Sequence, residues 1–151
     1  MLFRSAWKDG ALVCAAPDIL YVEPGDGKPA RVEKWFSGFP TENYQARVNG
    51  LSLGLDGWIY GANGLLGGSI KGRAGDQTID IRNRDFRFLP GANQFEPVAG
   101  LTQQGRVRDD FGAWFGCDNS TSLRHYPMAD RYVQRNPDVS FPDPEIGRAH
   151  V

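Results

Sequence analysis

The feature that most constrains this chain is an Asp-Gly turn signal that recurs before short apolar runs. It stands at Asp9-Gly10, at Asp56-Gly57 and, with one residue inserted, at Asp110-Phe111-Gly112, so successive glycines lie 47 and 55 positions apart. Glycine accepts a positive φ and aspartate tolerates one, so Asp-Gly between alternating apolar runs predicts a tight turn between strands. A repeat of this length, built of short strands, is typical of β-propeller blades.

The segments around these turns alternate as strands do. Leu51, Leu53 and Leu55 alternate before the second turn. Trp58 and Tyr60 alternate after it, which predicts two half-buried strands whose aromatic side chains pack between neighbouring sheets. Further strands are predicted at 19–23, 30–39 (as a third strand), 77–91, 95–101 and 123–128. Helical patterns are poor, because Gly or Pro interrupts every apolar stripe of helical period. The expected fold class is all-β: a partial β-propeller of about three blades of short antiparallel strands.

The two ends of the chain are set apart from this pattern. Residues 1–5 and 145–151 fit in-frame translations of a common short-read sequencing adapter, one in each orientation, which predicts that both ends are non-native. The expected domain is a partial propeller over residues 6–144, an internal piece of a longer gene. Its blades are predicted at roughly 6–48, 49–105 and 106–144.

The composition fits a folded β protein and excludes two classes of partner. The 151 residues include 19 Gly, 10 Pro, 9 Phe, 5 Tyr and 4 Trp, which is rich in turn formers and aromatic residues. Lys and Arg number 17 and Asp and Glu 18, so the net charge is −1 and no basic surface for nucleic acid is expected. No apolar run approaches the roughly 18 residues that a membrane span needs.

The order of the motifs resembles that of one protein family. The runs "APDILYVEPGDGK", "NGLSLGLDGWIYGANG", "DFRFLPG" and "WFGCDNS…HY…DRY…RNP" follow one another in the chain. They resemble the N-terminal region of large secreted proteins of planctomycetes and verrucomicrobia that are labelled membrane-bound dehydrogenases. The resemblance covers nearly all of residues 9–139, and the last run is its most specific part.

This resemblance implies a propeller distantly similar to soluble glucose and sorbosone dehydrogenases. It would act on a sugar or an alcohol in the periplasm or outside the cell, with pyrroloquinoline quinone and calcium in the full-length protein. Its partners would be a small carbohydrate or alcohol and the rest of the same polypeptide. Whether the region is catalytic stays open, because one fold hosts many functions. The alternative is a non-catalytic propeller that binds a glycan or a protein partner.

The two cysteines do not support the c-type haem that family members often carry in a further domain. Cys14 and Cys117 lie 103 positions apart, and neither belongs to a Cys-x-x-Cys-His motif. A disulfide between them would require two blades to bring their Cα atoms within about 7 Å. Buried free thiols are the expected state.

The densest polar cluster, "CDNSTSLRH" at 117–125, supplies the candidate catalytic residues. His125 is the candidate base for a hydroxyl proton, and Arg124 is the candidate cation beside a reduced quinone. Because the two are adjacent, a strand would direct them to opposite faces, which counts against their acting together. The alternative for His125 is an inert strand residue at a blade surface.

Two neighbouring loops supply the other candidates. Asp118 is the candidate calcium ligand, because a carboxylate oxygen suits that ion. Asn119 beside it, and Asn63 in the Gly-rich run "GANGLLGG", are the candidate substrate-binding residues. The alternative for Asp118 and Asn119 is to cap the turn after "WFG" through side-chain-to-backbone hydrogen bonds. The Gly-rich run lacks dinucleotide-loop spacing and is expected to be a flexible loop between strands.

The run "RNRDFRF" at 82–88 interleaves arginine with phenylalanine, as a nucleic-acid platform does. Alternation places Phe86 and Phe88 on one face and Asp85 and Arg87 on the other. Mixed charge in a chain of net charge −1 favours a strand with a solvated face.

Overall fold

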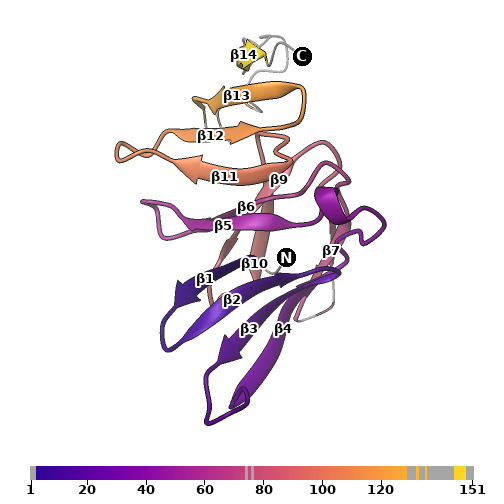
Figure 1. The fold of residues 1–151 in the computed structure, drawn as a ribbon, viewed down its shortest axis with the longest axis vertical. Coiled ribbons are helices and arrows are strands. Elements are labelled where there is room, and N and C mark those ends of the chain that lie inside the picture. The colour runs from indigo at the N-terminus through magenta and orange to yellow at the C-terminus, as the bar shows by residue number, and fades with distance from the viewer. Residues whose placement is uncertain are drawn as a thin grey trace.

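The computed structural model describes residues 3–73, 75, 77–128, 132, 135 and 145–148, and this part of the chain is all-β as predicted. Its strands form three antiparallel sheets that follow one another along the longest axis of the molecule (Figure 1). A 3-10 turn, η1 (Tyr44–Ala46), lies in the connection between the first two sheets, and the side-chain oxygen of Asn43 caps it. Within these residues, no helix has the length and apolar character to cross a membrane.

The first sheet is a four-stranded meander to which a later hairpin is added. Buried side chains alternate with partly exposed ones along its second strand, where Leu12 and Cys14 face the core. The added hairpin comes from later in the chain, and it pairs with the fourth strand between Phe36 and Gly72. In spatial order the strands are β1 (Phe3–Trp7), β2 (Gly10–Ala15), β3 (Asp18–Glu23), β4 (Arg31–Ser37), β7 (Ser69–Gly72) and β8 (Thr78–Asp80).

The second and third sheets are four-stranded meanders too. The second contains, in order, β10 (Gln94–Val98), β9 (Asp85–Leu89), β6 (Ile59–Ala62) and β5 (Asn49–Leu53). The third contains β11 (Gln104–Arg108), β12 (Trp114–Cys117), β13 (Thr121–Tyr126) and β14 (Glu145–Arg148). Strand β5 contacts β1 on one side and β11 on the other. The first strands of the three meanders are therefore neighbours, in the order of the chain.

The recurring Asp-Gly signal occupies the same place in all three sheets, between the first and the second strand. Gly57 and Gly112 have φ values of 80° and 89°, the left-handed region that glycine enters without steric cost. In the first sheet Lys8 takes the positive φ instead, and Gly10 begins β2. The predicted turns are confirmed, although the residue with positive φ differs in the first.

Three strand predictions differ from the structure. The run 77–91 contains two strands, β8 of the first sheet and β9 of the second. The run 30–39, predicted as a third strand, contains the fourth strand β4, because β1 begins within the residues that were set aside as non-native. Leu53 and Leu55 are exposed, since β5 ends at Leu53 and Leu55 lies in the following turn, whereas Leu51 reaches the core. The adapter origin of the two ends stays a prediction.

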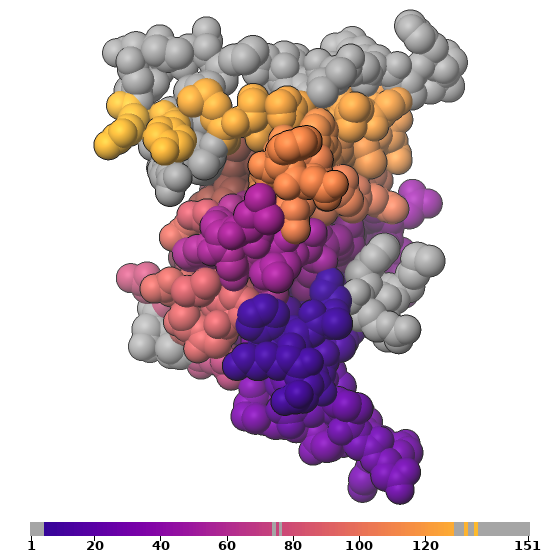
Figure 2. All heavy atoms as spheres, turned by 90° about the vertical axis from the view of Figure 1, so that its left-hand side faces the viewer, coloured from indigo at the N-terminus to yellow at the C-terminus, as the bar shows by residue number. Residues whose placement is uncertain are grey.

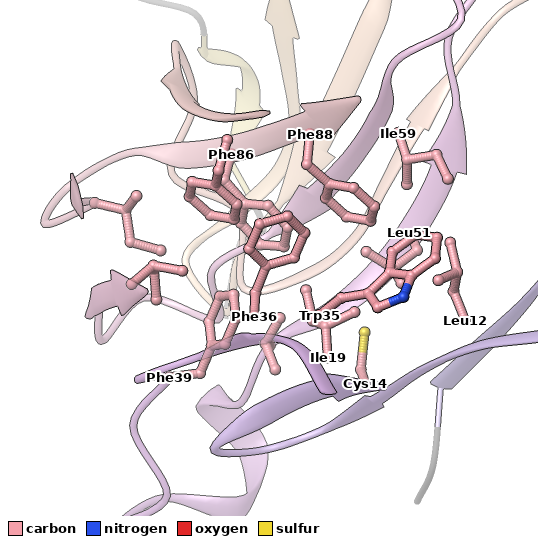
Figure 3. Packing of buried hydrophobic residues seen from close by; sticks show 14 of the residues in the cluster. Leu12, Cys14, Ile19, Trp35, Phe36, Phe39, Leu51, Ile59, Phe86 and Phe88 are labelled. Carbon is pink, nitrogen blue, oxygen red and sulfur yellow. The ribbon is translucent and has the colours of Figure 1, made fainter. Parts of the chain in front are cut away.

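The main core lies between the first and the second sheet, where aromatic side chains from both meet (Figure 3). The ring centroids of Phe36 and Phe88 lie 5.0 Å apart, and those of Phe39 and Phe86 lie 5.2 Å apart. Such pairs add about 0.5–1.5 kcal/mol each to the free energy gained by burial. Phe86 and Phe88 share the buried face that alternation predicts, but Asp85, predicted on a solvated face, is also fully buried.

Candidate functional site

Three of the predicted site residues come together at the turn between β12 and β13. Asp118, Asn119 and Arg124 line an open hollow of about 650 Å³. Asp118 Oδ1 accepts hydrogen bonds from the backbone N–H groups of Ser120 and Thr121, and Asp118 Oδ2 lies 2.7 Å from Arg124 Nη2. The turn cap that was the alternative for Asp118 is confirmed. Both of its carboxylate oxygens are thus engaged by the chain itself.

The calcium role of Asp118 gains nothing from its surroundings. Across the described residues, no group of three or more His, Cys, Asp or Glu side chains is placed to hold a metal ion. The carboxylate is used by a turn and an arginine, which is an arrangement that does not fit a calcium site. Its metal-binding role stays a prediction.

The two candidate catalytic residues have different surroundings. The His125 ring stacks on Phe115 of the adjacent strand, with centroids 4.8 Å apart. The Arg124 guanidinium is paired with Asp118 at the hollow. These partners agree with the expectation that adjacent strand residues face opposite ways. The structure does not bring this base and this cation over one substrate position.

Asn63 lies apart from Asn119 and is fully buried. Its Nδ2 donates to the backbone oxygens of Ile81 and Arg84, and its Oδ1 accepts from the backbone N–H of Leu65. The amide therefore holds the loop after β6 in place through bonds within the chain. Substrate binding by Asn63 and by the exposed Asn119 stays a prediction.

Both cysteines are free thiols, which answers the question that the sequence left open. Cys14 is buried in the main core, and this burial raises the pKa of its thiol to about 12. Cys117 is partly exposed on β12, so the predicted burial holds for Cys14 and is wrong for Cys117.

A second hollow, which we call the interface cleft, opens between the second and the third sheet. It has a volume of about 520 Å³ and is lined by residues of the β5–β6 turn, of β9, of β10 and of the β11–β12 turn. Because antiparallel strands reverse at each turn, the β11–β12 turn and the β12–β13 turn lie at opposite ends of the third sheet. Figure 2 looks onto the end with the cleft, where the orange β11–β12 turn lies beside the magenta β5–β6 turn.

Arg106 of β11 forms the floor of this cleft. Its side chain is 3% exposed, and its Nη1 donates to Asp85 Oδ2 over 2.8 Å and to the Ala99 carbonyl over 2.7 Å. The guanidinium carbon also lies within 6 Å of three aromatic rings, which attract a cation through their electron-rich faces. These rings are Tyr126 at 4.8 Å, Trp114 at 5.3 Å and Tyr60 at 5.6 Å. A buried charge requires partners of this kind, because it has lost its water.

Asp85 holds Arg106 from beneath and joins the two sheets. Its Oδ1 accepts from the backbone N–H groups of Asn63 and Thr102, at 3.2 and 3.1 Å. Its Oδ2 accepts from the Thr102 hydroxyl at 2.6 Å, as well as from Arg106. The Thr102 hydroxyl is also 3.1 Å from the Tyr126 hydroxyl. The carboxylate is fully buried and its hydrogen-bonding capacity is used.

Arg87 of β9 organises the acidic end of the cleft. Its Nη1 lies 3.2 Å from Asp56 Oδ2, and its Nη2 lies 2.8 Å from Glu96 Oε2. The Tyr60 hydroxyl donates to Asp56 Oδ2 over 2.9 Å, and the Trp58 ring lies 4.3 Å from the Arg87 guanidinium. Burial acts to lower the pKa of Arg87, but its hydrogen bonds to Glu96 and Tyr60 outweigh burial and raise it above its usual range.

The remaining walls of the cleft are aromatic and apolar. The Tyr60 and Trp114 rings lie 4.1 Å apart across the two sheets, which confirms the prediction that Tyr60 packs between sheets. Trp58, predicted to pack in the same way, is partly exposed and lies against Arg87 of its own sheet. Burial raises the pKa of Tyr60 above its ordinary value. Three exposed apolar side chains surround the opening: Leu55, Phe111 and Met128. Exposed apolar groups gathered at a polar-lined hollow are typical of a ligand-binding groove.

The sequence reasoning missed the cleft and its two arginines. Its residues come from segments 55–60, 87–99, 106–114 and 126–128, which no local pattern joins. The one available signal was the repeat itself, because Tyr60 and Trp114 each follow an Asp-Gly turn and meet across the sheets.

The fold and the cleft define an all-β protein of antiparallel meander sheets with a ligand-sized cleft between two of them, since small-molecule sites measure about 300–1,000 Å³. Residues 4–150 match the model of a family described as a domain of unknown function, DUF7133, so the chain belongs to that family. No curated protein and no solved structure matches the chain. The description of the family assigns no activity, and the function has to be argued from the geometry.

Proposed function

We propose that this chain forms three consecutive blades of a β-propeller and binds a carbohydrate in the interface cleft. The propeller is supported by three meanders whose first strands, β1, β5 and β11, are neighbours in chain order. It is also supported by the turn signal at the same place in each sheet. Blades of a propeller are four-stranded sheets whose first strands surround a common channel. An experimental structure of a longer gene product tests this: first strands that do not share one axis would overturn it.

The single observation that carries the carbohydrate proposal is the combination of groups around the cleft. Phe111 is 94% exposed and Trp114 is partly exposed, and both line the same cleft as the carboxylates of Asp56 and Glu96, which Arg87 holds. A sugar ring has apolar C–H faces that pack on aromatic rings and a hydroxyl edge that bonds to carboxylates. The cleft thus combines apolar and aromatic side chains with a few placed polar groups, as sites for small molecules do.

A quinone-dependent redox reaction has less support from the geometry. It requires a base and a cation at one substrate position, and His125 and Arg124 have separate surroundings. The family resemblance remains the support for that hypothesis. A location in the periplasm or outside the cell is proposed on the same resemblance, and extracellular glycans would be the carbohydrates met there.

Calorimetric titration of the chain with a panel of soluble oligosaccharides tests the proposed function. Phe111→Ala removes an exposed ring at the cleft and should weaken binding by about three- to tenfold, the loss of one ring contact. Tyr44→Ala is the matched control, because Tyr44 is 83% exposed and lies outside the cleft. The proposal would be overturned if no oligosaccharide binds, or if both variants weaken binding equally.

A further inference from the structure

The charges in the interface cleft restrict which carbohydrate it accepts. The cations of the lining are Arg87 and Arg106, and each is already paired. Arg106 is neutralised by Asp85, and Arg87 is shared by Asp56 and Glu96. Among the described lining residues, negative charge therefore exceeds positive charge once the buried partner of Arg106 is counted. An anionic ligand would meet like charge and would be disfavoured.

The groups that a ligand meets first are acceptors. The side chains of Asp56 and Glu96 are 42% and 48% exposed, whereas that of Arg87 is 20% exposed. An ionised carboxylate only accepts hydrogen bonds, so its natural partner is a ligand rich in hydroxyl donors. Arg87 lies behind the two carboxylates and fixes their positions, which lowers the entropy lost when a ligand binds. The acidic end of the cleft is thus preorganised for a polyol.

The apolar side of the cleft complements such a ligand. Phe111 and Leu55 project from the two neighbouring turns, and Leu55 Cδ1 lies 3.1 Å from where a side chain on Gly112 would begin. A pyranose with equatorial hydroxyls carries its hydroxyls at the rim of the ring and leaves C–H groups on both faces. Its rim can bond to the carboxylates while one face packs on Phe111.

We infer that the cleft binds an uncharged oligosaccharide of equatorially substituted pyranoses, and that Asp56 and Glu96 reject uronic acid and sulfated sugars. This inference rests on the proposed carbohydrate function. It adds a substrate class, and it assigns specificity to two carboxylates that also hold Arg87.

The test compares a neutral β-linked glucan hexasaccharide with a polyuronate hexasaccharide by calorimetric titration of the 151-residue chain. At low ionic strength the neutral ligand should bind at least about tenfold more tightly, because juxtaposed like charges are strongly unfavourable. Added salt should reduce the ratio of the two binding constants, neutral over polyuronate, since salt screens the repulsion between exposed charges. Glu96→Gln should also reduce it, because it removes one negative charge while keeping the shape of the side chain. Glu42→Gln, at an exposed acid outside the cleft, should leave the ratio unchanged.

The outcomes separate this inference from the proposed function. Tighter binding of the polyuronate, or a ratio that Glu96→Gln does not change, would overturn the inference. In that case the proposed function survives if Phe111→Ala still weakens binding of the polyuronate. Absence of binding to every glycan would overturn both. A ratio that falls with Glu96→Gln but not with Glu42→Gln supports the inference.

Discussion

Asp85 and Arg106 form an ion pair in the interior, between the second and the third sheet, with 2.8 Å between Asp85 Oδ2 and Arg106 Nη1. Removing two charges from water costs several kcal/mol per ion, and their attraction offsets this only with good geometry and additional hydrogen bonds. Here Thr102 and two backbone N–H groups satisfy Asp85, and the Ala99 carbonyl and three rings surround Arg106. We therefore expect the pair to specify one arrangement of these segments more than to add net stability.

Replacement of one partner should be costly. Asp85→Ala would leave the Arg106 charge uncompensated and two backbone N–H groups without an acceptor, so we expect a loss of about 3–5 kcal/mol in the free energy of unfolding. Urea denaturation followed by tryptophan fluorescence measures it. Arg82→Ala, which breaks the exposed Asp80–Arg82 pair, is the control and should cost far less, because water screens an exposed pair. Equal losses in the two variants would contradict this account of the buried pair.

The Cys14 thiol gives the stability a pH dependence above neutrality. Burial raises its pKa from the ordinary 9.0 to about 12. At pH values between these two pKa values, the unfolded chain loses the thiol proton and the folded chain keeps it. The free energy of unfolding therefore falls as the pH rises. The slope for one group is about 1.4 kcal/mol per pH unit. The buried Tyr60 and Tyr126, whose pKa values burial also raises, act in the same direction at higher pH.

The expected result is a smaller loss of stability between about pH 8 and about pH 10.5 in Cys14→Ala than in the parent chain, because the alanine variant has no such proton. Urea denaturation at both pH values measures it. The slopes are compared, since the variant also loses packing at every pH. Val48→Ala, which also loses core packing but removes no titrating group, serves as the control and should keep the slope of the parent. A Cys14→Ala variant with an unchanged slope would show that this thiol does not set the dependence.

Among the elements, the hairpin β7–β8 links two sheets. It lies in sequence between β6 and β9 of the second sheet, yet it pairs with β4 of the first. Gly38, just after β4, permits this pairing: its φ is 112°, and a Cβ there would overlap the Ser69 carbonyl oxygen of β7. A side chain at this position is excluded both by its own backbone and by the neighbouring strand.

Gly38→Ala should therefore cost more than the conformational strain alone. Gly27 is the matched control, because its φ is 71° and nothing lies within 4 Å of a Cβ placed there. Gly27→Ala should cost about 1–2 kcal/mol, the price of a left-handed alanine, and Gly38→Ala about 1–3 kcal/mol more. Thermal and urea denaturation compare the two. Similar costs would mean that β7 shifts easily and that the hairpin contributes little.

The strands that could be predicted are those with local signals. Asp-Gly turns and alternating apolar residues give β2, β3, β4, β5, β6, β10 and β13 to within a few residues, whereas the run predicted over 77–91 contains both β8 and β9. The pairing of β7 with β4 could not be predicted, because "SIKG" is short and its partner lies more than thirty positions earlier. The burial of Asp85 and the cleft above it could not be predicted for the same reason. The partners of a buried charge come from distant segments, and composition does not reveal them.

At the scale of the whole molecule, the junctions between sheets differ in character. The first junction is an apolar aromatic core, whereas the second is held by polar groups. Besides the Asp85–Arg106 pair, Asn49 of β5 spans the second junction. Its Nδ2 donates to the Gln103 carbonyl over 2.7 Å, and its Oδ1 accepts from the Gly105 N–H over 2.8 Å. One buried amide thus completes hydrogen bonding between the first strands of two sheets.

Asn49→Ala should weaken the second junction in particular. It removes both bonds and leaves the buried Gln103 carbonyl without this donor, which should lower the free energy of unfolding by about 1–3 kcal/mol. Relative to the parent chain, the substitution should accelerate hydrogen exchange more in β11 and β12 than in β2 and β3, because local opening occurs where contacts are weakened. Asn119→Ala, at an exposed turn position, is the control and should change neither quantity. Uniform acceleration across all sheets would contradict a junction held by Asn49.

The β7–β8 hairpin, which lies between strands of the second sheet in sequence but pairs with the first, has a consequence for the synthesis of this protein. A ribosome delivers residues in order, at about 5–20 residues per second. The outer edge of β4 stays uncovered until β7, which ends at Gly72, has left the exit tunnel. By then β5 and β6 have emerged as well, so the nascent chain cannot complete one repeat before it starts the next. The first and second repeats are thus interlocked during synthesis, and separating them would leave the paired edges of β4 and β7 exposed to aggregation.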